Sequence, residues 1–189
     1  MEWFKAAEKF TDALASSDPT PGGGAAAAMA AAMGCSLALM AIQTTCNKKN
    51  TSPEIKSRLS TVLRKLAALK VQLDHFVQED GEAYAAYVAA KQLPKDNPSR
   101  EKAMQDALIH AARVPMDTAT TAIMCLREIE PLETDISPII LSDIYCAKHL
   151  LKTSVHCSIE NIKANLTFIQ DKAWIEKLSR AIGVFLKSC

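Results

Sequence analysis

Residues 53–92 have the sequence PEIKSRLSTVLRKLAALKVQLDHFVQEDGEAYAAYVAAKQ, in which apolar side chains recur at alternating steps of four and three positions. This spacing places them on one face of an α-helix, because the helix completes a turn in about 3.6 residues. We therefore predict one long helix over residues 53–92 that packs against other helices. The apolar lane consists of Ile55, Leu59, Val62, Leu66, Leu69, Leu73 and Phe76.

The same spacing, continued toward the C-terminus, arrives at Asp80 and then at Ala83 and Tyr87. Asp80 stands where the pattern expects an apolar residue, and burial disfavours the ionised form of a carboxyl group. A carboxyl group in such a place is a candidate for general acid–base catalysis. The alternative is that Asp80 caps a neighbouring helix or pairs with a lysine such as Lys91, and the spacing leaves both interpretations open.

The rest of the chain shows five further helical patterns and no convincing strand pattern. Three helices are expected to start at a small capping residue followed by proline, because proline at the first helical position gives up no hydrogen bond. Pro115 should kink or split the helix that contains it. The capping pairs are Ser52-Pro53, Asn97-Pro98 and Ser137-Pro138. The other helices span about 2–15, 98–129, 138–170 and 172–187, together with an alanine-rich helix that follows Gly24. The sequence thus predicts an all-α fold, a multi-helix bundle with long central helices that forms one domain over residues 1–189.

The composition supports packed helices and argues against several classes of function. Of the 189 residues, 49% are apolar and 5% are aromatic, so the core must be mainly aliphatic. The net charge of +1 gives no strong field, and we expect neither a nucleic-acid nor a membrane partner. The six cysteines form no C-x-x-C pair and the four histidines show no metal-ligand spacing, so we expect reduced cysteines and no metal. The N-terminus lacks the order of a signal peptide, which predicts a cytoplasmic protein.

The segment from Gly22 to Cys46 contains no charged residue and is long enough to span a bilayer. It is dominated by alanine and other small residues rather than by leucine or phenylalanine. Small side chains let helix backbones approach closely, so we favour a buried central helix over a transmembrane span.

A run of turn-forming residues, Pro19-Thr20-Pro21-Gly22-Gly23-Gly24, precedes this alanine-rich helix. Glycines let a ligand approach the backbone, and the free N–H groups of a helix N-terminus favour an anionic or polarised group. The spacing matches no nucleotide-binding motif. The run is either a ligand-binding loop or an ordinary Pro/Gly turn.

Polar residues near the ends of two helices are further candidates. Asn161 and Asn165 lie one turn apart on one helix face, and Asp143 shares their side but precedes Asn161 by about 27 Å along the helix. These three side chains line an elongated site, belong to a site shared between subunits, or form a solvated edge. Lys48 and Lys49 either bind a ligand or compensate the dipole of the alanine-rich helix.

Several blocks of sequence occur in a characteristic order. The segment 14–24 with its alanine run is followed by Asn47-Lys48-Lys49, Glu79-Asp80-Gly81-Glu82-Ala83-Tyr84, Lys91-Gln92-Leu93-Pro94-Lys95, Val114-Pro115-Met116, Ser142-Asp143 and Asn161-Ile162-Lys163-Ala164-Asn165-Leu166. Together these blocks cover most of the chain and resemble the formiminotransferase-cyclodeaminase C-terminal domain family. That family includes formiminotetrahydrofolate cyclodeaminases and bacterial methenyltetrahydrofolate cyclohydrolases.

The resemblance implies an all-helical homodimer that binds a folate near the glycine run and uses no cofactor besides its tetrahydrofolate substrate. The aspartate regarded as catalytic in the family falls on Asp80. The residues expected to bind the substrate are Pro21, Gly22, Gly23, Gly24, Lys48, Lys49, Asp143, Asn161 and Asn165, with the two lysines meeting the glutamate tail of the folate. The chain departs from the family pattern at Asn47, Tyr145, His156 and Cys157, where changes can reshape the pocket and its specificity.

The first expectation is cyclodeamination, in which N10 attacks the N5-formimino carbon and ammonia leaves to give 5,10-methenyltetrahydrofolate. The near-equal alternative is cyclohydrolysis, in which water opens the methenyl ring to 10-formyltetrahydrofolate. Both reactions pass through a tetrahedral carbon between two nitrogens and need a proton moved, the role expected of Asp80. A non-catalytic folate-binding or helical interaction module is the third possibility.

Overall fold

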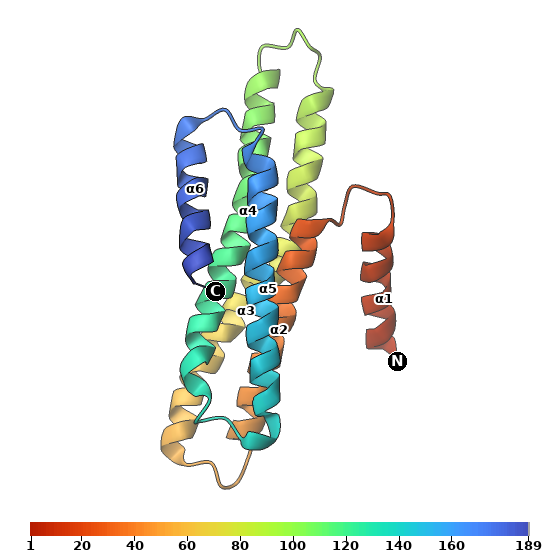
Figure 1. The fold of residues 1–189 in the computed structure, drawn as a ribbon. Helices are drawn as coiled ribbons and strands as arrows, with labels where there is room; N and C mark the ends of the chain where they lie inside the picture. Colours follow the sequence, from red (N-terminus) through yellow and green to blue (C-terminus); the bar gives the residue numbers. More distant parts are fainter. Residues whose placement is uncertain (189) are drawn as a thin grey trace.

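The computed structural model describes residues 1–188 as a bundle of long helices without a strand, which confirms the all-α prediction (Figure 1). Cys189, one of the six cysteines, lies outside the described residues. Two short 3₁₀ turns, η1 (Glu130–Leu132) and η2 (Pro138–Ile140), connect the fourth helix to the fifth. The helices are α1 (Glu2–Ala15), α2 (Gly23–Cys46), α3 (Pro53–Gln92), α4 (Arg100–Ile129), α5 (Leu141–Leu166) and α6 (Lys172–Lys187).

The alanine-rich helix α2 lies in the middle of the bundle and packs against α3, α4 and α5. Its small side chains allow close approach: a β-carbon on Gly34 would lie 2.9 Å from the carbonyl oxygen of Ala147 in α5. α2 is long and apolar enough to cross a membrane, but 56% of its most apolar 18-residue stretch is buried inside the bundle. The predicted central helix is therefore confirmed.

The apolar lane of α3 faces the core as its spacing predicted. Leu59, Leu66, Leu73 and Ala83 are buried, and they pack with α2 and α4. The predicted cap is also present, since the Ser52 hydroxyl accepts a hydrogen bond from the backbone N–H of Ile55 at 3.3 Å.

Two of the three predicted helix starts lie later than expected. Asn97 accepts from the N–H of Ser99 at 2.9 Å, so Pro98 belongs to a turn and α4 begins only at Arg100. Ser137-Pro138 opens the 3₁₀ turn η2 rather than an α-helix, and α5 follows from Leu141. In both places the proline lies in a tight turn, and the regular α-helix begins after that turn.

Pro115 was predicted to kink or split its helix, and the split is wrong, because α4 runs without a break from Arg100 to Ile129 with Pro115 buried inside it. Proline lacks the N–H that would bond the carbonyl of Ala111, four residues earlier. The side-chain Nδ2 of Asn165 in α5 donates to that carbonyl at 3.1 Å instead. A side chain from a neighbouring helix thus replaces the missing backbone donor.

The two terminal helices differ in their surroundings. α6 packs against α4 and α5 and is capped by Asp171, whose carboxylate accepts from the N–H groups of Ala173 and Trp174. α1 stands outside the bundle beside α2, and none of its residues is buried (Figure 1).

Candidate active site

The first turn of α2 meets the carboxyl group of Asp80 on α3. The backbone N–H of Ala25 donates to Oδ2 of Asp80 at 2.9 Å, across 55 residues of sequence. The first N–H groups of a helix have no partner within the helix, so Asp80 serves as a cap supplied from outside. Asp80 therefore does cap a neighbouring helix, as one of the two interpretations of the sequence expected, and it uses one of its two carboxyl oxygens to do so.

The glycine run is shaped to the side chains that face it. A β-carbon on Gly24 would lie 2.0 Å from Oδ1 of Asp80, and one on Gly23 would lie 3.2 Å from the side-chain amide of Asn161. Gly22 is the N-cap residue of α2. The absence of side chains at Gly23 and Gly24 lets Asp80 and Asn161 come against the backbone at the start of the helix.

A pocket of about 350 Å³ adjoins this contact. It is bounded by the glycine run, by one face of α3, by α4 and by the C-terminal end of α5. Asp80 is the only ionisable carboxyl group in its lining, and paired amides and aromatic rings surround it. The lining consists of Pro19, Thr20, Gly22, Gly23, Gly24, Asp80, Tyr84, Tyr87, Leu108, Ala111, Asn161, Asn165 and Phe168.

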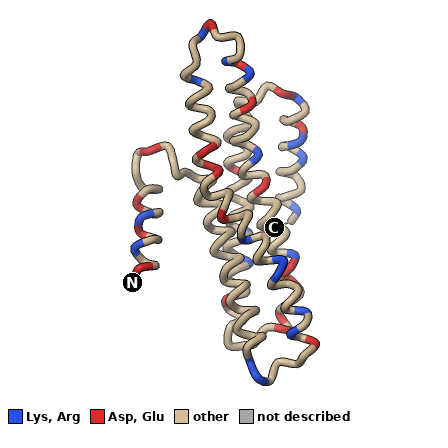
Figure 2. The backbone as a smooth tube through the Cα atoms, turned by 180° about the vertical axis from the view of Figure 1, so that it is seen from behind, with Lys and Arg blue, Asp and Glu red and all other residues tan. Residues whose placement is uncertain are grey.

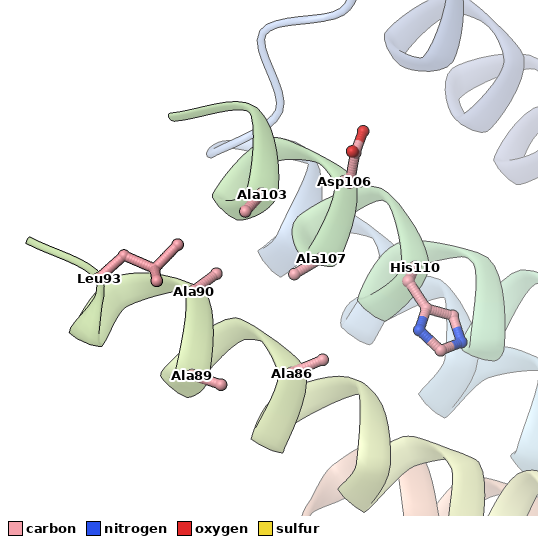
Figure 3. Close-up of a pocket in the computed structure, with 8 residues that line it drawn as sticks. All are labelled: Ala86, Ala89, Ala90, Leu93, Ala103, Asp106, Ala107 and His110. Atoms are coloured by element: carbon pink, nitrogen blue, oxygen red, sulfur yellow. The ribbon is translucent and has the colours of Figure 1, made fainter. Parts of the chain in front are cut away.

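A second pocket, of about 550 Å³, lies between the C-terminal end of α3 and the N-terminal end of α4 (Figure 3). Its walls are mainly alanine, and Figure 3 shows the carboxyl group of Asp106 directed away from the facing helix. A binding site for a polar metabolite needs several polar groups that converge on one volume. The smaller pocket beside Asp80 meets this requirement, whereas the alanine-walled pocket does not.

The surroundings of Asp80 raise the pKa of its carboxyl group. Burial raises the pKa of Asp80, the hydrogen bond from Ala25 lowers it, and the net shift is upward. Within residues 1–188 no basic side chain pairs with Asp80 and its Oδ1 has no hydrogen-bond donor. The next residue along the chain behaves differently, since Glu79 contacts His110 at 3.0 Å and Arg113 at 3.6 Å. Asp80 therefore has the properties of a proton-transfer group, and Glu79 those of a structural ion pair.

Asn161 and Asn165 both reach the pocket and are both fixed by backbone carbonyls. Nδ2 of Asn161 donates to Cys157 at 2.8 Å, and Nδ2 of Asn165 donates to Ala111 at 3.1 Å and to Asn161 at 3.0 Å. Each side chain thus uses its NH₂ group on the protein. The two amide oxygens are left as hydrogen-bond acceptors for a ligand.

Pro21 adjoins the pocket-lining Gly22 but is not itself part of the lining. Three other predicted substrate-binding residues, Lys48, Lys49 and Asp143, lie at the opposite end of the bundle. Lys48 follows the C-terminus of α2, about 36 Å from the glycine run for a helix of 24 residues. Its Nζ donates to the hydroxyl of Ser137, and Asp143 lies in the first turn of α5 at the same end. One chain therefore does not bring Lys48, Lys49 or Asp143 to Asp80, and their role in substrate binding stays a prediction.

Seven residues of the pocket lining were not named as site residues from the sequence: Pro19, Thr20, Tyr84, Tyr87, Leu108, Ala111 and Phe168. Tyr84 and Tyr87 stand four and seven positions after Asp80, so helical spacing does place them on its face. Leu108 carries no chemical signal, and Phe168 lies beyond the end of α5, where no periodicity applies. Phe168 is 64% exposed and lines the pocket.

The positions that depart from the family pattern lie outside the pocket lining. Tyr145 is exposed and its hydroxyl is 3.4 Å from Glu133, while His156 and Cys157 are exposed on α5. Cys157 contributes only its carbonyl, which fixes Asn161. For residues 1–188, no three or more His, Cys, Asp or Glu side chains gather in a way that would hold a metal ion.

Comparison with known proteins finds relatives that are named as enzymes of folate chemistry. The family model described as formiminotransferase-cyclodeaminase matches residues 6–183. A methenyltetrahydrofolate cyclohydrolase of Methylorubrum extorquens is 34% identical over 177 residues, which are 90% of this chain and 83% of that protein. The formimidoyltransferase-cyclodeaminase of Rattus norvegicus is 31% identical over 88% of this chain, but the match spans only 31% of the rat protein. A solved structure of formiminotetrahydrofolate cyclodeaminase from Thermotoga maritima superposes with a TM-score of 0.85 at 25% identity, covering 96% of this chain and 88% of that one.

Proposed function

The chain belongs to the formiminotransferase-cyclodeaminase family, and we propose that it hydrolyses 5,10-methenyltetrahydrofolate to 10-formyltetrahydrofolate with Asp80 as the proton-transfer group. The observation that carries this proposal is the state of Asp80. Its carboxyl group has a raised pKa and lines the pocket. One of its oxygens accepts a hydrogen bond from Ala25, and the other has no partner within residues 1–188. A group poised in this way suits a reaction that must take up and return a proton.

The choice of hydrolysis is supported by the relative that is matched over most of its length. The Methylorubrum cyclohydrolase is covered to 83%, so its activity is named for a protein not much longer than this chain. In the rat protein about two thirds of the length has no counterpart here. The name of that larger protein therefore describes more than the part that resembles this chain.

Asp80 takes up the proton that leaves the attacking water and later delivers it to N5. The substrate carries a positively charged N5–CH–N10 amidinium, and the carboxylate form of Asp80 stabilises a cation beside it. Water attacks the methenyl carbon and gives a proton to the carboxylate, which leaves a neutral tetrahedral carbon bearing a hydroxyl. The N5–C bond then breaks, the proton passes from Asp80 to N5, and the hydroxyl proton is lost to solvent as the formyl group forms on N10.

The remaining pocket residues suit the binding of a flat heterocycle with amide and amine groups. The oxygens of Asn161 and Asn165 can accept hydrogen bonds from N–H groups of the pterin. The rings of Tyr84 and Phe168, which line the pocket, can stack on its face. Asp80 then stands where the ring meets the one-carbon unit.

Cyclodeamination is the second candidate, and the structural likeness to the Thermotoga cyclodeaminase favours it. In that reaction N10 attacks the formimino carbon and ammonia departs with a proton. A carboxyl group with a raised pKa holds its proton more readily and can supply it to the leaving ammonia, so the same side chain serves both reactions.

One spectrophotometric experiment separates the candidates, since 5,10-methenyltetrahydrofolate absorbs where the other folates do not. Loss of the methenyl signal faster than in buffer supports hydrolysis. Appearance of the signal from 5-formiminotetrahydrofolate, with release of ammonia, supports cyclodeamination and contradicts our first choice. Enzyme that changes neither rate contradicts both, and points to the non-catalytic module.

A further inference from the structure

The pocket beside Asp80 has to orient its ligand mainly with neutral groups. Figure 2 shows lysine, arginine, aspartate and glutamate residues spread along the helices and in the loops of the bundle. Of the described residues that line the pocket, however, only Asp80 is of a charged type. The directions in which the amides of Asn161 and Asn165 point therefore decide whether this part of the pocket offers hydrogen-bond donors or acceptors.

The side-chain amide of Asn165 is held in one orientation. Its Nδ2 carries two hydrogens, and two backbone carbonyls accept from it, that of Ala111 in α4 at 3.1 Å and that of Asn161 in α5 at 3.0 Å. Turning the amide by half a revolution would place its Oδ1 against both carbonyl oxygens, where acceptor faces acceptor. The Oδ1 of Asn165 is therefore fixed as the acceptor that this side chain offers to the pocket.

The amide of Asn161 is held differently. Its Nδ2 donates to the carbonyl of Cys157 at 2.8 Å, one turn earlier in the same helix. A carbonyl inside an α-helix also accepts the backbone N–H four residues later, so the side chain shares this acceptor with the helix. In the part of the chain that the structure describes, the second Nδ2 hydrogen of Asn161 has no partner. Asn161 thus lacks the two-sided fixation of Asn165.

The carbonyl of Ala111 is available to Asn165 because residue 115 is a proline. In an unbroken α-helix the N–H of residue 115 would bond this carbonyl, and proline has no N–H. Pro115 is buried within α4, while Ala111, one turn earlier, lines the pocket. The side chain of Asn165 therefore does not share the oxygen of Ala111 with the backbone of residue 115. The missing helix bond and the fixed amide are two sides of one contact.

We propose that Pro115 is a positioning residue for the substrate: it leaves the carbonyl of Ala111 to Asn165, whose Oδ1 is thereby kept as an acceptor for an N–H group of the bound ring. Pro115 is not among the described residues that line the pocket, so it acts only through Ala111 and Asn165. The orientation of the amide follows from its contacts. That the ring belongs to a tetrahydrofolate rests on the proposed function.

The orientation is tested without a ligand, by hydrogen exchange of side-chain amide protons in the full chain, followed by NMR. In the wild type both Nδ2 protons of Asn165 should exchange slowly. In Pro115→Ala the new backbone N–H bonds the carbonyl of Ala111, so the Asn165 proton that used this carbonyl should exchange about tenfold faster. The amide of Asn161 is the internal reference, because it does not contact Ala111.

Two further variants separate the lost proline from other effects. Pro115→Val restores the same backbone N–H but fills more of the buried space, so it should reproduce the result of Pro115→Ala if the N–H rather than a cavity is responsible. Pro131→Ala is the matched control, since Pro131 is exposed in η1 and should leave the exchange of Asn165 unchanged. Circular dichroism should show equal helix content in all variants. Slow exchange of Asn165 in both Pro115 variants overturns the proposal.

The consequence for the substrate is tested by steady-state kinetics. Pro115→Ala should raise KM about three- to tenfold, the loss expected for one weakened hydrogen bond, while kcat stays within about twofold of the wild type. A variant that only loosened the fold would reduce the fraction of active protein and hence kcat. Pro131→Ala should change neither constant. An unchanged KM in Pro115→Ala, or a loss confined to kcat, overturns the positioning role.

The path through Asn165 is tested by combining substitutions. In the Pro115→Ala background, Asn165→Ala should raise KM by a smaller factor than in the wild type, because the contact is already weakened. Asn161→Ala should raise KM by the same factor in both backgrounds. Equal factors for Asn165→Ala would show that Pro115 does not act through this residue, and would overturn the proposal.

These experiments also distinguish failure of the inference from failure of the proposed function. If the wild type turns over neither folate, the proposed function fails, and the exchange experiment still decides whether Pro115 fixes Asn165. The Kd of 5-formyltetrahydrofolate then replaces KM in the same set of variants. A wild type that does not bind this folate overturns the ligand contact of Asn165.

Discussion

A β-carbon on Gly24 would lie 2.0 Å from Oδ1 of Asp80 and 2.6 Å from its Cγ, so the side chain of one helix requires a glycine at the start of another. This relationship joins two features that the sequence presents separately, an acid in an apolar lane and a run of glycines. It also places Asp80, the candidate catalytic residue, at the N-terminus of α2. Displacing either partner should therefore affect both stability and turnover.

Gly24→Ala tests that relationship directly. The added methyl group must push the carboxyl group away and weaken its bond to Ala25, so turnover should fall at least about tenfold. The free energy of unfolding should fall by about 1–3 kcal/mol, the usual effect of overpacking. Urea denaturation and the methenyl assay measure the two effects.

The control for this substitution is Gly183→Ala in α6, where an added β-carbon meets nothing within 4 Å. Alanine is the better helix former, so this variant should be more stable by up to about 1 kcal/mol with unchanged turnover. Equal behaviour of the two variants would contradict the contact with Asp80.

Asp80→Asn removes the proton-transfer group and keeps its shape. The amide oxygen can still accept from Ala25, so the protein should fold while turnover falls by about 10²–10⁴-fold. Glu79→Gln is the matched control, because Glu79 adjoins Asp80 in sequence but pairs with His110 and does not line the pocket. A variant Asp80→Asn that turns over normally would rule out the proposed role.

The raised pKa of Asp80 predicts how stability depends on pH. In the unfolded chain the carboxyl group loses its proton near its ordinary pKa of about 3.9, before it does so in the folded protein. Between the two pKa values the folded state binds more protons, so Asp80 contributes stability at low pH that is lost as the pH rises through this window. The stability of Asp80→Asn relative to wild type should therefore increase as the pH rises from about 3 toward neutrality. A constant difference, measured by urea denaturation at several pH values, would contradict the burial of this group.

Much of the fold follows from patterns that are local in the sequence. Helical spacing located α3, and the same lane identified Asp80, because one acid among apolar residues is conspicuous on a single helix. The Ser52 cap was predicted for the same reason, since its donor is only three residues away. Tyr84 and Tyr87 could have been added to the site from their spacing alone.

Other features depend on contacts between distant segments, and local patterns do not show them. Phe168 reaches the pocket only because the chain turns after α5. Lys48 and Asp143 resemble site residues, but the length of the helices carries them to the other end of the bundle in one chain. Local spacing left a split at Pro115 open as one of two outcomes, because a compensating donor 50 residues away in sequence cannot be inferred from it.

The pairing of Pro115 with Asn165 can be measured with a double-mutant cycle. Asn165→Ala removes the donor to the carbonyl of Ala111, and an unsatisfied carbonyl in a partly buried place should lower the free energy of unfolding by about 1–3 kcal/mol. Pro115→Ala restores a backbone N–H that can bond the same carbonyl. In the Pro115→Ala background the Asn165→Ala substitution should therefore be milder, with a coupling energy of about 1 kcal/mol in urea denaturation. Strictly additive effects would show that the carbonyl of Ala111 does not depend on Asn165, and that α4 tolerates its proline for another reason.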